Sequence, residues 1–276
     1  MAILFILGLV SLVVADKFTA VKEVSICGGT MPCSCGDVLV KDYTMTYDLN
    51  NCSGEFGLGF RGNGKYITLN CNGHTISGIR KNDSVGLYMN YRNGSTIINC
   101  IIENFGDGIF IDGEEVVHVE LNAIKYNSNN GILMNAINNK YISQSNITNN
   151  KNGIYIDDDT KFAYLGGIWK NNIYNNYEDG IYVLKSSWLN LYNNSIVNNG
   201  KYGAETMNPE FTFIQANNFE NNFVGNAYEH NGSQTNTWNS TNIGNRWDDF
   251  ESNPGYPNYY EVPGPGNGID WYPNKI

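Results

Sequence analysis

The sequence predicts an all-β chain wound into a right-handed, single-stranded parallel β-helix, a solenoid of about eight coils. Two columns of residues recur with one shared period of about 23 residues. The first column consists of glycines that open apolar strands, namely Gly86, Gly108, Gly131, Gly153, Gly180, Gly203 and Gly225. The second is apolar and consists of Ile101, Ile124, Ile147, Ile173, Ile196, Phe219 and Ile243. Because two independent columns share a period, we expect each repeat to form one coil.

Polar residues, mostly asparagines, flank the second column on both sides. Two residues before it stand Asn99, Asn122, Ser145, Asn171, Asn194 and Asn217. Three residues after it stand Asn104, Asn127, Asn150, Asn176, Asn199 and Asn222. Coils stacked at the interstrand distance of ~4.8 Å place like residues above one another. The amides are then expected to hydrogen-bond along the helix axis as structural ladders, without a catalytic role.

Other repeat architectures fit the sequence less well. The Leu-x-x-Leu-x-Leu pattern of leucine-rich repeats and the Gly-Gly-x-Gly-x-Asp pattern of calcium-binding β-rolls are both absent. A left-handed hexapeptide helix would show a period of six residues. Val117, Val119 and Leu121 alternate with polar residues, which indicates a strand and argues against helical repeats.

Several segments resemble a known class of proteins. Gly-Ile-Phe-Ile (108–111), Gly-Ile-Tyr-Ile (153–156) and Gly-Ile-Tyr-Val (180–183) look like parallel β-helix repeats of the NosD-like, carbohydrate-binding and sugar-hydrolase class. Residues 69–76 resemble the first coil of that class, and residues 244–247 with 266–273 resemble its C-terminal cap. The resemblance covers nearly the whole mature chain. It implies the fold but not a reaction, since the class includes lyases, epimerases, hydrolases and non-catalytic surface proteins.

The ends of the chain differ in composition from the repeats, and four segments are expected. They are a signal peptide (1–15), a cysteine-rich N-terminal cap (16–54), the β-helix (55–247) and an aromatic, proline-rich C-terminal cap (248–276). Residues 1–15 are almost entirely apolar and carry no charge, which predicts a secreted or cell-surface protein with no membrane insertion after signal removal. The formal net charge of -10 argues against nucleic acid as a partner.

Two further features agree with export. Six cysteines lie in the N-terminal portion of the chain, namely Cys27, Cys33, Cys35, Cys52, Cys71 and Cys100. The strands at 66–71 and 96–100 are expected to be adjacent, so we predict a Cys71–Cys100 disulfide, with the other four cysteines bonded among themselves in the cap. Glycosylation sequons occur at Asn51, Asn82, Asn93, Asn146, Asn193, Asn231 and Asn239.

An outward stripe of large apolar side chains is the first candidate binding site. In Gly-Ile-x-Ile both isoleucines face the core, so the middle residue faces solvent. This rule places Tyr88, Phe110, Leu133, Tyr155 and Tyr182 in one outward column, followed by Glu205. Four steps of ~4.8 Å make the stripe roughly 19 Å long. Aromatic faces can pack against sugar rings, and the stripe therefore predicts a glycan-binding surface.

An acidic turn beside the stripe is the second candidate. The longest interior coil gains about four residues after Gly153, at the run that begins with Asp157, Asp158 and Asp159. Together with Asp112, these carboxylates could hold calcium, which prefers oxygen ligands. Some β-helix polysaccharide lyases resemble this arrangement, and Asp158 and Lys185 are then the catalytic candidates. The carboxylate of Asp158 would favour the charged form of Lys185, however, which makes it a poor base.

Two functions follow from these candidates. The first is a non-catalytic extracellular protein that contacts a polysaccharide, a cell-surface glycan or another surface protein through the stripe. The alternative is a calcium-assisted polysaccharide lyase or a related glycan-processing enzyme. The two differ in whether acid and base groups converge on one substrate position.

Overall fold

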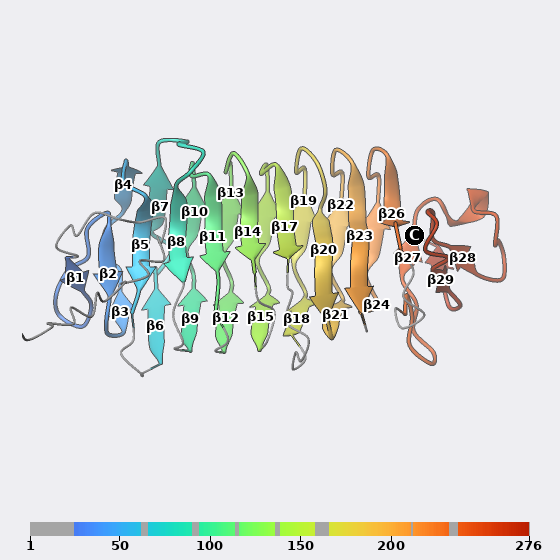
Figure 1. The fold of residues 1–276 in the computed structure, drawn as a ribbon, viewed down its shortest axis with the longest axis horizontal. Helices are drawn as coiled ribbons and strands as arrows, with labels where there is room; N and C mark the ends of the chain where they lie inside the picture. Colours follow the sequence, from blue (N-terminus) through green and yellow to red (C-terminus); the bar gives the residue numbers. More distant parts are fainter. Residues whose placement is uncertain are drawn as a thin grey trace, which may run out of the picture.

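The structure, a computed structural model, describes residues 25–61, 66–89, 94–113, 116–135, 139–157, 166–210, 212–231 and 237–275. Strands stack side by side along one long axis, as the row of arrows in Figure 1 shows. Three long sheets run the length of the molecule, and each turn of the chain contributes one strand to each sheet in order. We call them sheets 1, 2 and 3. The predicted parallel β-helix is confirmed.

Sheet 1 contains the glycine-initiated strands. It consists of β1 (Ile26–Cys27), β2 (Asp37–Leu39), β5 (Phe56–Phe60), β8 (Val85–Met89), β11 (Asp107–Ile111), β14 (Asn130–Met134), β17 (Asn152–Asp157), β20 (Ile181–Ser187), β23 (Tyr202–Glu210) and β26 (Gly225–Glu229).

Sheet 2 follows sheet 1 in every coil. It consists of β3 (Tyr43–Thr44), β6 (Ile67–Asn70), β9 (Ser95–Ile98), β12 (Val117–Glu120), β15 (Lys140–Ser143), β18 (Gly166–Trp169), β21 (Leu189–Tyr192) and β24 (Phe213–Gln215).

Sheet 3 completes each coil. It consists of β4 (Leu49–Cys52), β7 (Thr75–Gly78), β10 (Ile101–Glu103), β13 (Ala123–Lys125), β16 (Asn146–Thr148), β19 (Asn172–Tyr174), β22 (Ser195–Val197), β25 (Asn218–Glu220), β27 (Arg246–Trp247) and β30 (Asn274–Lys275). A short antiparallel pair, β28 (Tyr260–Glu261) and β29 (Ile269–Asp270), and a single 3-10 turn, η1 (Phe250–Ser252), lie at the C-terminal end. In the described part of the chain no helix is long and apolar enough to cross a membrane.

The number of coils differs slightly from the prediction. Within the described residues of 55–247, seven three-strand coils run from β5–β7 to β23–β25, fewer than the expected eight. One more coil, β2–β4, lies in the cysteine-rich segment and pairs in parallel with β5–β7. The parallel strand pairing of the β-helix therefore begins before residue 55.

The apolar column of sheet 3 is buried as expected, but its two ends were assigned wrongly. Ile124 pairs with Ile102 instead of Ile101, and Phe219 pairs with Trp247, whereas Ile243 is 45% exposed. Ile102 lies 16 residues after Gly86, the same spacing that separates Gly108 from Ile124, and Cys100 takes the buried position that Asn122 has in the next coil. At the other end a longer connection brings Trp247 into line.

Two asparagine ladders are present, and the first member of each lies one residue later than expected. In each, a backbone N–H donates to the side-chain oxygen of the next ladder residue, as from Asn171 to Asn194 (3.1 Å) and from Asn176 to Asn199 (3.2 Å). Cys100 and Phe105 occupy the positions expected for Asn99 and Asn104, which instead adopt positive φ in the turns. Buried backbone groups of the turns thereby obtain partners without water.

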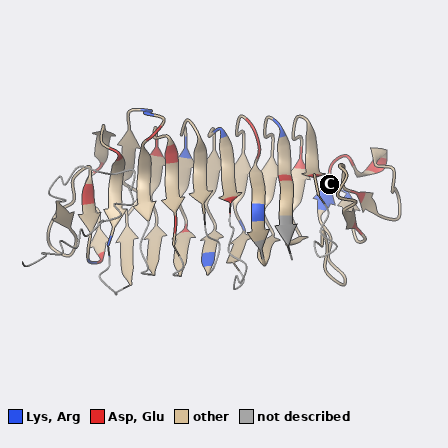
Figure 2. Cartoon of the chain, viewed as in Figure 1, with Lys and Arg blue, Asp and Glu red and all other residues tan. Residues whose placement is uncertain are grey.

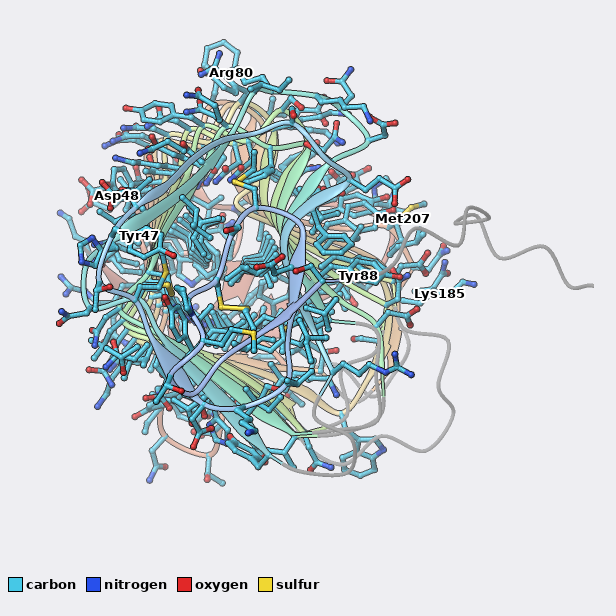
Figure 3. The ribbon with its side chains drawn as sticks, turned by 90° about the vertical axis from the view of Figure 1, so that its left-hand side faces the viewer. Tyr47, Asp48, Arg80, Tyr88, Lys185 and Met207 are labelled. Atoms are coloured by element: carbon cyan, nitrogen blue, oxygen red, sulfur yellow. A yellow bond between two sulfur atoms is a disulfide. The ribbon has the colours of Figure 1, made fainter. Side chains whose placement is uncertain are left out.

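The disulfides are those expected. Cys71 and Cys100 are bonded, and the remaining four cysteines form Cys27–Cys33 and Cys35–Cys52. Strands β6 and β9 pair in parallel, which places Cys71 and Cys100 just beyond their ends in adjacent coils. In Figure 3, which looks along the solenoid, the sulfur–sulfur bonds lie inside the outline formed by the strands.

The C-terminal end closes the stack with buried polar and aromatic groups. The indole of Trp247 lies between Phe219 (4.6 Å between ring centroids) and Tyr260 (4.0 Å). The Asp270 carboxylate accepts hydrogen bonds from the Asn245 backbone N–H (2.7 Å) and the Trp247 indole (3.0 Å), so it ends one asparagine ladder. These contacts cover the last strand edges, which would otherwise invite association.

Candidate functional site

The outward stripe lies on sheet 1 in the predicted register. Cross-strand pairs join Tyr88 to Phe110, Leu133 to Tyr155, and Tyr182 to Glu205, and the column continues to Tyr228. The apolar members are half-buried, while the aliphatic residues and methionines on either side of them are buried. Figure 3, which looks along the helix, shows Tyr88, Lys185 and Met207 on the same side of the molecule.

The rings of the stripe stack on each other. Tyr88 and Phe110 have centroids 5.5 Å apart and planes 16° apart, and Tyr155 and Tyr182 have values of 5.0 Å and 22°. Rings lying flat on the sheet would collide at this spacing. The rings therefore stand with their planes away from the sheet surface, and each covers a face of its neighbour. The faces within each stacked pair are covered by the neighbouring ring. The non-aromatic residues Leu133 and Glu205 interrupt the column after the first pair and after the second pair.

The stripe is longer at both ends than the sequence indicated. The Phe56 ring lies over Gly59, where a Cβ atom would come within 3.2 Å of it, and it stacks on Tyr88 at 6.0 Å. At the other end Tyr228 stands one coil beyond Glu205 and packs on Tyr202 at 5.0 Å. The repeat period places Tyr228 one coil after Glu205, so the sequence could have predicted it. Phe56 is not in register with the column, so the repeat pattern does not identify it.

A polar cluster interrupts the stripe at Glu205. One carboxylate oxygen of Glu205 bonds the Lys201 ammonium, and the other lies 2.6 Å from Nε2 of His230. The Asp179 carboxylate lies 3.8 Å from the same Lys201 nitrogen. We call these four residues the Glu205 cluster. Sequence reasoning missed it, because Lys201 and His230 lie at turn positions outside both columns.

Burial separates the two signs of charge in this cluster. The side chains of Glu205 and Asp179 are only 5% and 2% exposed, whereas those of Lys201 and His230 are 39% and 32% exposed. The carboxylates thus form the floor, and the nitrogen donors form the surface. An ionised Glu205 requires a proton on Nε2 of His230, which fixes the orientation of that ring.

The pKa values of the two carboxylates are shifted in opposite directions. Burial and the neighbouring Glu205 carboxylate raise the pKa of Asp179 to about 7, against the opposing effects of the Tyr202 backbone N–H and Lys201. Burial opposes ionisation of Glu205 as well, but hydrogen bonds from Lys201 and His230 outweigh it and lower the pKa of Glu205. Near neutral pH the pair therefore shares a proton, held mainly on Asp179.

A third polar ladder, which the sequence did not reveal, positions Asp179. It runs along the start of the sheet 1 strands through Asp107, Asn130 and Asn152. Asn152 accepts a hydrogen bond from the Asp179 backbone N–H (3.2 Å), and Asp179 accepts one from the Tyr202 backbone N–H (3.0 Å). The cluster is thus built on paired strands, which fix side chains better than loops do.

The predicted acidic turn is only partly described. Asp157 pairs with Lys185 across a bulge. The strands β11, β14 and β17 pair in register up to Ile111, Met134 and Ile156, so Asn135 lies in line between Asp112 and Asp157. Two coil steps, roughly 10 Å, therefore separate the backbones of these two aspartates. Asp158 and Asp159 lie outside the described residues. Within the described ranges, no group of three or more acidic, histidine or cysteine side chains is arranged to hold a metal ion.

The described sequons differ in accessibility. The side chains of Asn51, Asn82, Asn146, Asn193 and Asn231 are exposed, and that of Asn239 is half-buried. Asn93 lies outside the described residues. Asn193 directly precedes the buried ladder residue Asn194, so exposed and structural asparagines alternate within one turn.

Comparison with known proteins fixes the family. The sequence model described as "Right handed beta helix region" matches residues 85–246, which is more than half of the chain. The chain belongs to the right-handed β-helix family. No curated protein matches its sequence.

Solved structures with the same β-helix fold include a double mutant of the periplasmic alginate epimerase AlgG. It is 17% identical, with a TM-score of 0.54, and the match covers 71% of this chain and 58% of AlgG. The A-module of the Azotobacter vinelandii mannuronan C-5 epimerase AlgE4 (13% identity, TM-score 0.44, 76% of this chain and 68% of that one) is also similar. Pectate lyase Pel9A is similar too, with 13% identity and a TM-score of 0.44, over 86% of this chain and 70% of that one. At these identities the likeness shows the β-helix fold alone.

Proposed function

We propose that this β-helix is an extracellular, non-catalytic protein that contacts a polysaccharide or cell-surface glycan through the stripe on sheet 1. The observation that carries the proposal is the stripe itself, a column of large half-buried side chains on an otherwise asparagine-rich surface. Apolar columns of this length on an exposed face are typical of interaction surfaces. The three disulfides agree with an exported protein.

The upright stacking of the rings defines how a glycan would lie. Sugar C–H faces would meet the ring edges along the stripe and the ring faces at Leu133 and Glu205. From Leu133 to Glu205 are three coil steps, roughly 14 Å, so both interruptions can contact one short oligosaccharide. The similar structure AlgG is named as an alginate epimerase, which is consistent with a glycan partner.

The test is glycan-array binding by the secreted protein and by the double variant Tyr155→Ala/Tyr182→Ala. We expect binding to fall at least tenfold, because the variant removes a stacked pair from the middle of the stripe. The double variant Tyr174→Ala/Tyr192→Ala, with outward tyrosines on sheets 3 and 2, is the control and should bind normally. Both should stay folded, since each of these partly exposed rings contributes only about 1 kcal/mol.

The same samples separate this proposal from its rivals. If the wild type released unsaturated product from acidic polysaccharides, seen by ultraviolet absorbance, the lyase alternative with Asp158 and Lys185 would replace it. Register pairing with Asp157 places a carboxylate beside Lys185, which again argues against this lysine as a base. If the wild type bound no glycan and released no product, the stripe would be better explained as a packing surface for a surface protein or a second copy of the chain.

A further inference from the structure

Lys201 and Asp179 connect two adjacent coils within the Glu205 cluster. Asp179 lies shortly before β20 and Lys201 directly before β23, and these two strands pair in parallel. The Lys201 ammonium nitrogen lies 3.8 Å from Oδ2 of Asp179 and also bonds the Glu205 carboxylate. Figure 2 shows few charged residues on the strands around β23, so a lysine held between two buried carboxylates is unusual on this part of the solenoid.

The surroundings of Asp179 suit a carboxyl carbon that an amine attacks. The side chain is 2% exposed, which keeps bulk water away from it. Burial and the neighbouring Glu205 carboxylate raise the pKa of Asp179 to about 7, so the neutral acid, which is the better electrophile, is the main form below neutral pH. Oδ1 accepts a hydrogen bond from the Tyr202 backbone N–H (3.0 Å), which leaves the acidic hydrogen on Oδ2. The same N–H would stabilise the negative charge that develops on Oδ1 when a nucleophile adds to the carbon.

Glu205 is placed to accept the proton that Lys201 must lose. Its side chain is 5% exposed, bonds the Lys201 ammonium and also takes part in a hydrogen bond with Asp179. Burial lowers the pKa of Lys201, but the hydrogen bond to Glu205 and the charge of Asp179 outweigh it and raise the pKa overall. The free amine therefore forms by direct transfer of a proton to Glu205, along a hydrogen bond that already exists.

We propose that Lys201 and Asp179 condense to an amide, which cross-links two coils of the solenoid, with Glu205 as the proton carrier. Glu205 first takes a proton from the ammonium group and keeps it. The bond from Nζ of Lys201 to Cγ of Asp179 then forms, the Cγ–Oδ2 bond breaks, and Oδ2 leaves as water with its own hydrogen and one from Nζ. Attack requires Nζ within about 3.5 Å of Cγ, which a small rotation of the flexible lysine side chain provides. Neither an oxidant nor a glycan takes part, so the inference is independent of the proposed glycan binding.

The pair formed by Lys151 and Glu178 provides an internal control. Its nitrogen and oxygen are 3.7 Å apart, close to the distance between Lys201 and Asp179, but the two side chains are 50% and 48% exposed. Water solvates both charges, so this pair should remain an ordinary surface ion pair.

The test is peptide mapping of the full secreted chain after disulfide reduction, removal of N-glycans and digestion with chymotrypsin. Asp179 falls in peptide 178–182, Lys201 in peptide 193–202 and Lys151 in peptide 142–155. In the wild type we expect the first two peptides to be joined, with a mass one water molecule below their sum, and the third to be separate. Glu205→Gln should leave the first two separate, because it removes the proton acceptor at nearly constant size. Lys201→Arg, which retains the charge but not the amine, should also be unlinked.

Four results would contradict this assignment. Separate wild-type peptides after prolonged incubation at mildly acidic pH would show that the cluster is an ion pair alone. Loss of water from peptide 178–182 by itself would indicate cyclisation of Asp179 onto the Gly180 nitrogen instead of a cross-link. A link from Lys201 to Glu205 would identify the wrong carboxyl group, and a joined peptide in Glu205→Gln would overturn the role of Glu205. The wild-type result stands by itself if a variant is not secreted.

Discussion

Ile147→Asp is expected to prevent folding and secretion of the protein. Ile147 is fully buried in β16 and stacks in one column with Ile124 and Ile173. A carboxylate at this position would enter the apolar interior with no partner. Burying it lowers the free energy of unfolding by more than about 5 kcal/mol, which is a large part of the stability of a typical domain. The measurement is the amount of folded protein in the culture medium, with the melting temperature of whatever is recovered.

A matched substitution tests whether the position and not the charge is responsible. Tyr174→Asp lies on β19 in the next coil, but on the outward face. We expect it to be secreted in normal amounts, with a melting temperature within a few degrees of the wild type. Normal secretion and stability of Ile147→Asp would mean that the inward and outward faces of sheet 3 are assigned wrongly.

Asn176→Ala is expected to destabilise the protein by about 3 kcal/mol, since it leaves several buried polar groups without partners. The Asn176 amide donates to the Ile147 carbonyl (3.2 Å) and to Asn199 (3.0 Å), and it accepts from the backbone N–H (3.1 Å) and the side-chain amide (3.2 Å) of Asn150. Alanine removes all four bonds at a buried position. Chemical denaturation of the secreted protein gives the change in the free energy of unfolding.

The control for this variant is Asn172→Ala, four residues earlier. Asn172 is exposed and its amide donates to Asn146 on the surface, so its removal should cost less than about 1 kcal/mol. Equal effects of Asn172→Ala and Asn176→Ala would argue that the buried ladder contributes nothing specific.

The fold could be predicted from sequence because repetition multiplies a weak signal. Each Gly-Ile-x-Ile unit is ambiguous alone, but seven glycines at one period fix both the coil and the direction of every side chain in it. The register failed at the two ends, where non-local contacts decide it. Cys100 is bonded to Cys71, and Trp247 is held by Phe219 and Tyr260.

The candidate site was only half predictable for the same reason. The stripe follows from alternation within a strand, so its five members were placed correctly. The stacking of its rings depends on interstrand spacing and rotamers, and the Glu205 cluster depends on two turns and a strand from different coils. Lys201 lies four residues before Glu205 in the same coil, but only the stacking of coils brings Asp179 and His230 to this pair.

Hydroxyl-radical footprinting with mass spectrometry tests the central claim most directly, because it reports the exposure of individual aromatic side chains. The secreted protein is oxidised with and without the oligosaccharide that it retains most tightly on the array. We predict that the ligand reduces oxidation of Tyr155, Tyr182 and Tyr228 and leaves Tyr174 and Tyr192, on the other two sheets, unchanged. Protection of Tyr174 or Tyr192 with unaltered oxidation of the sheet 1 tyrosines would place the glycan on another face and contradict the account.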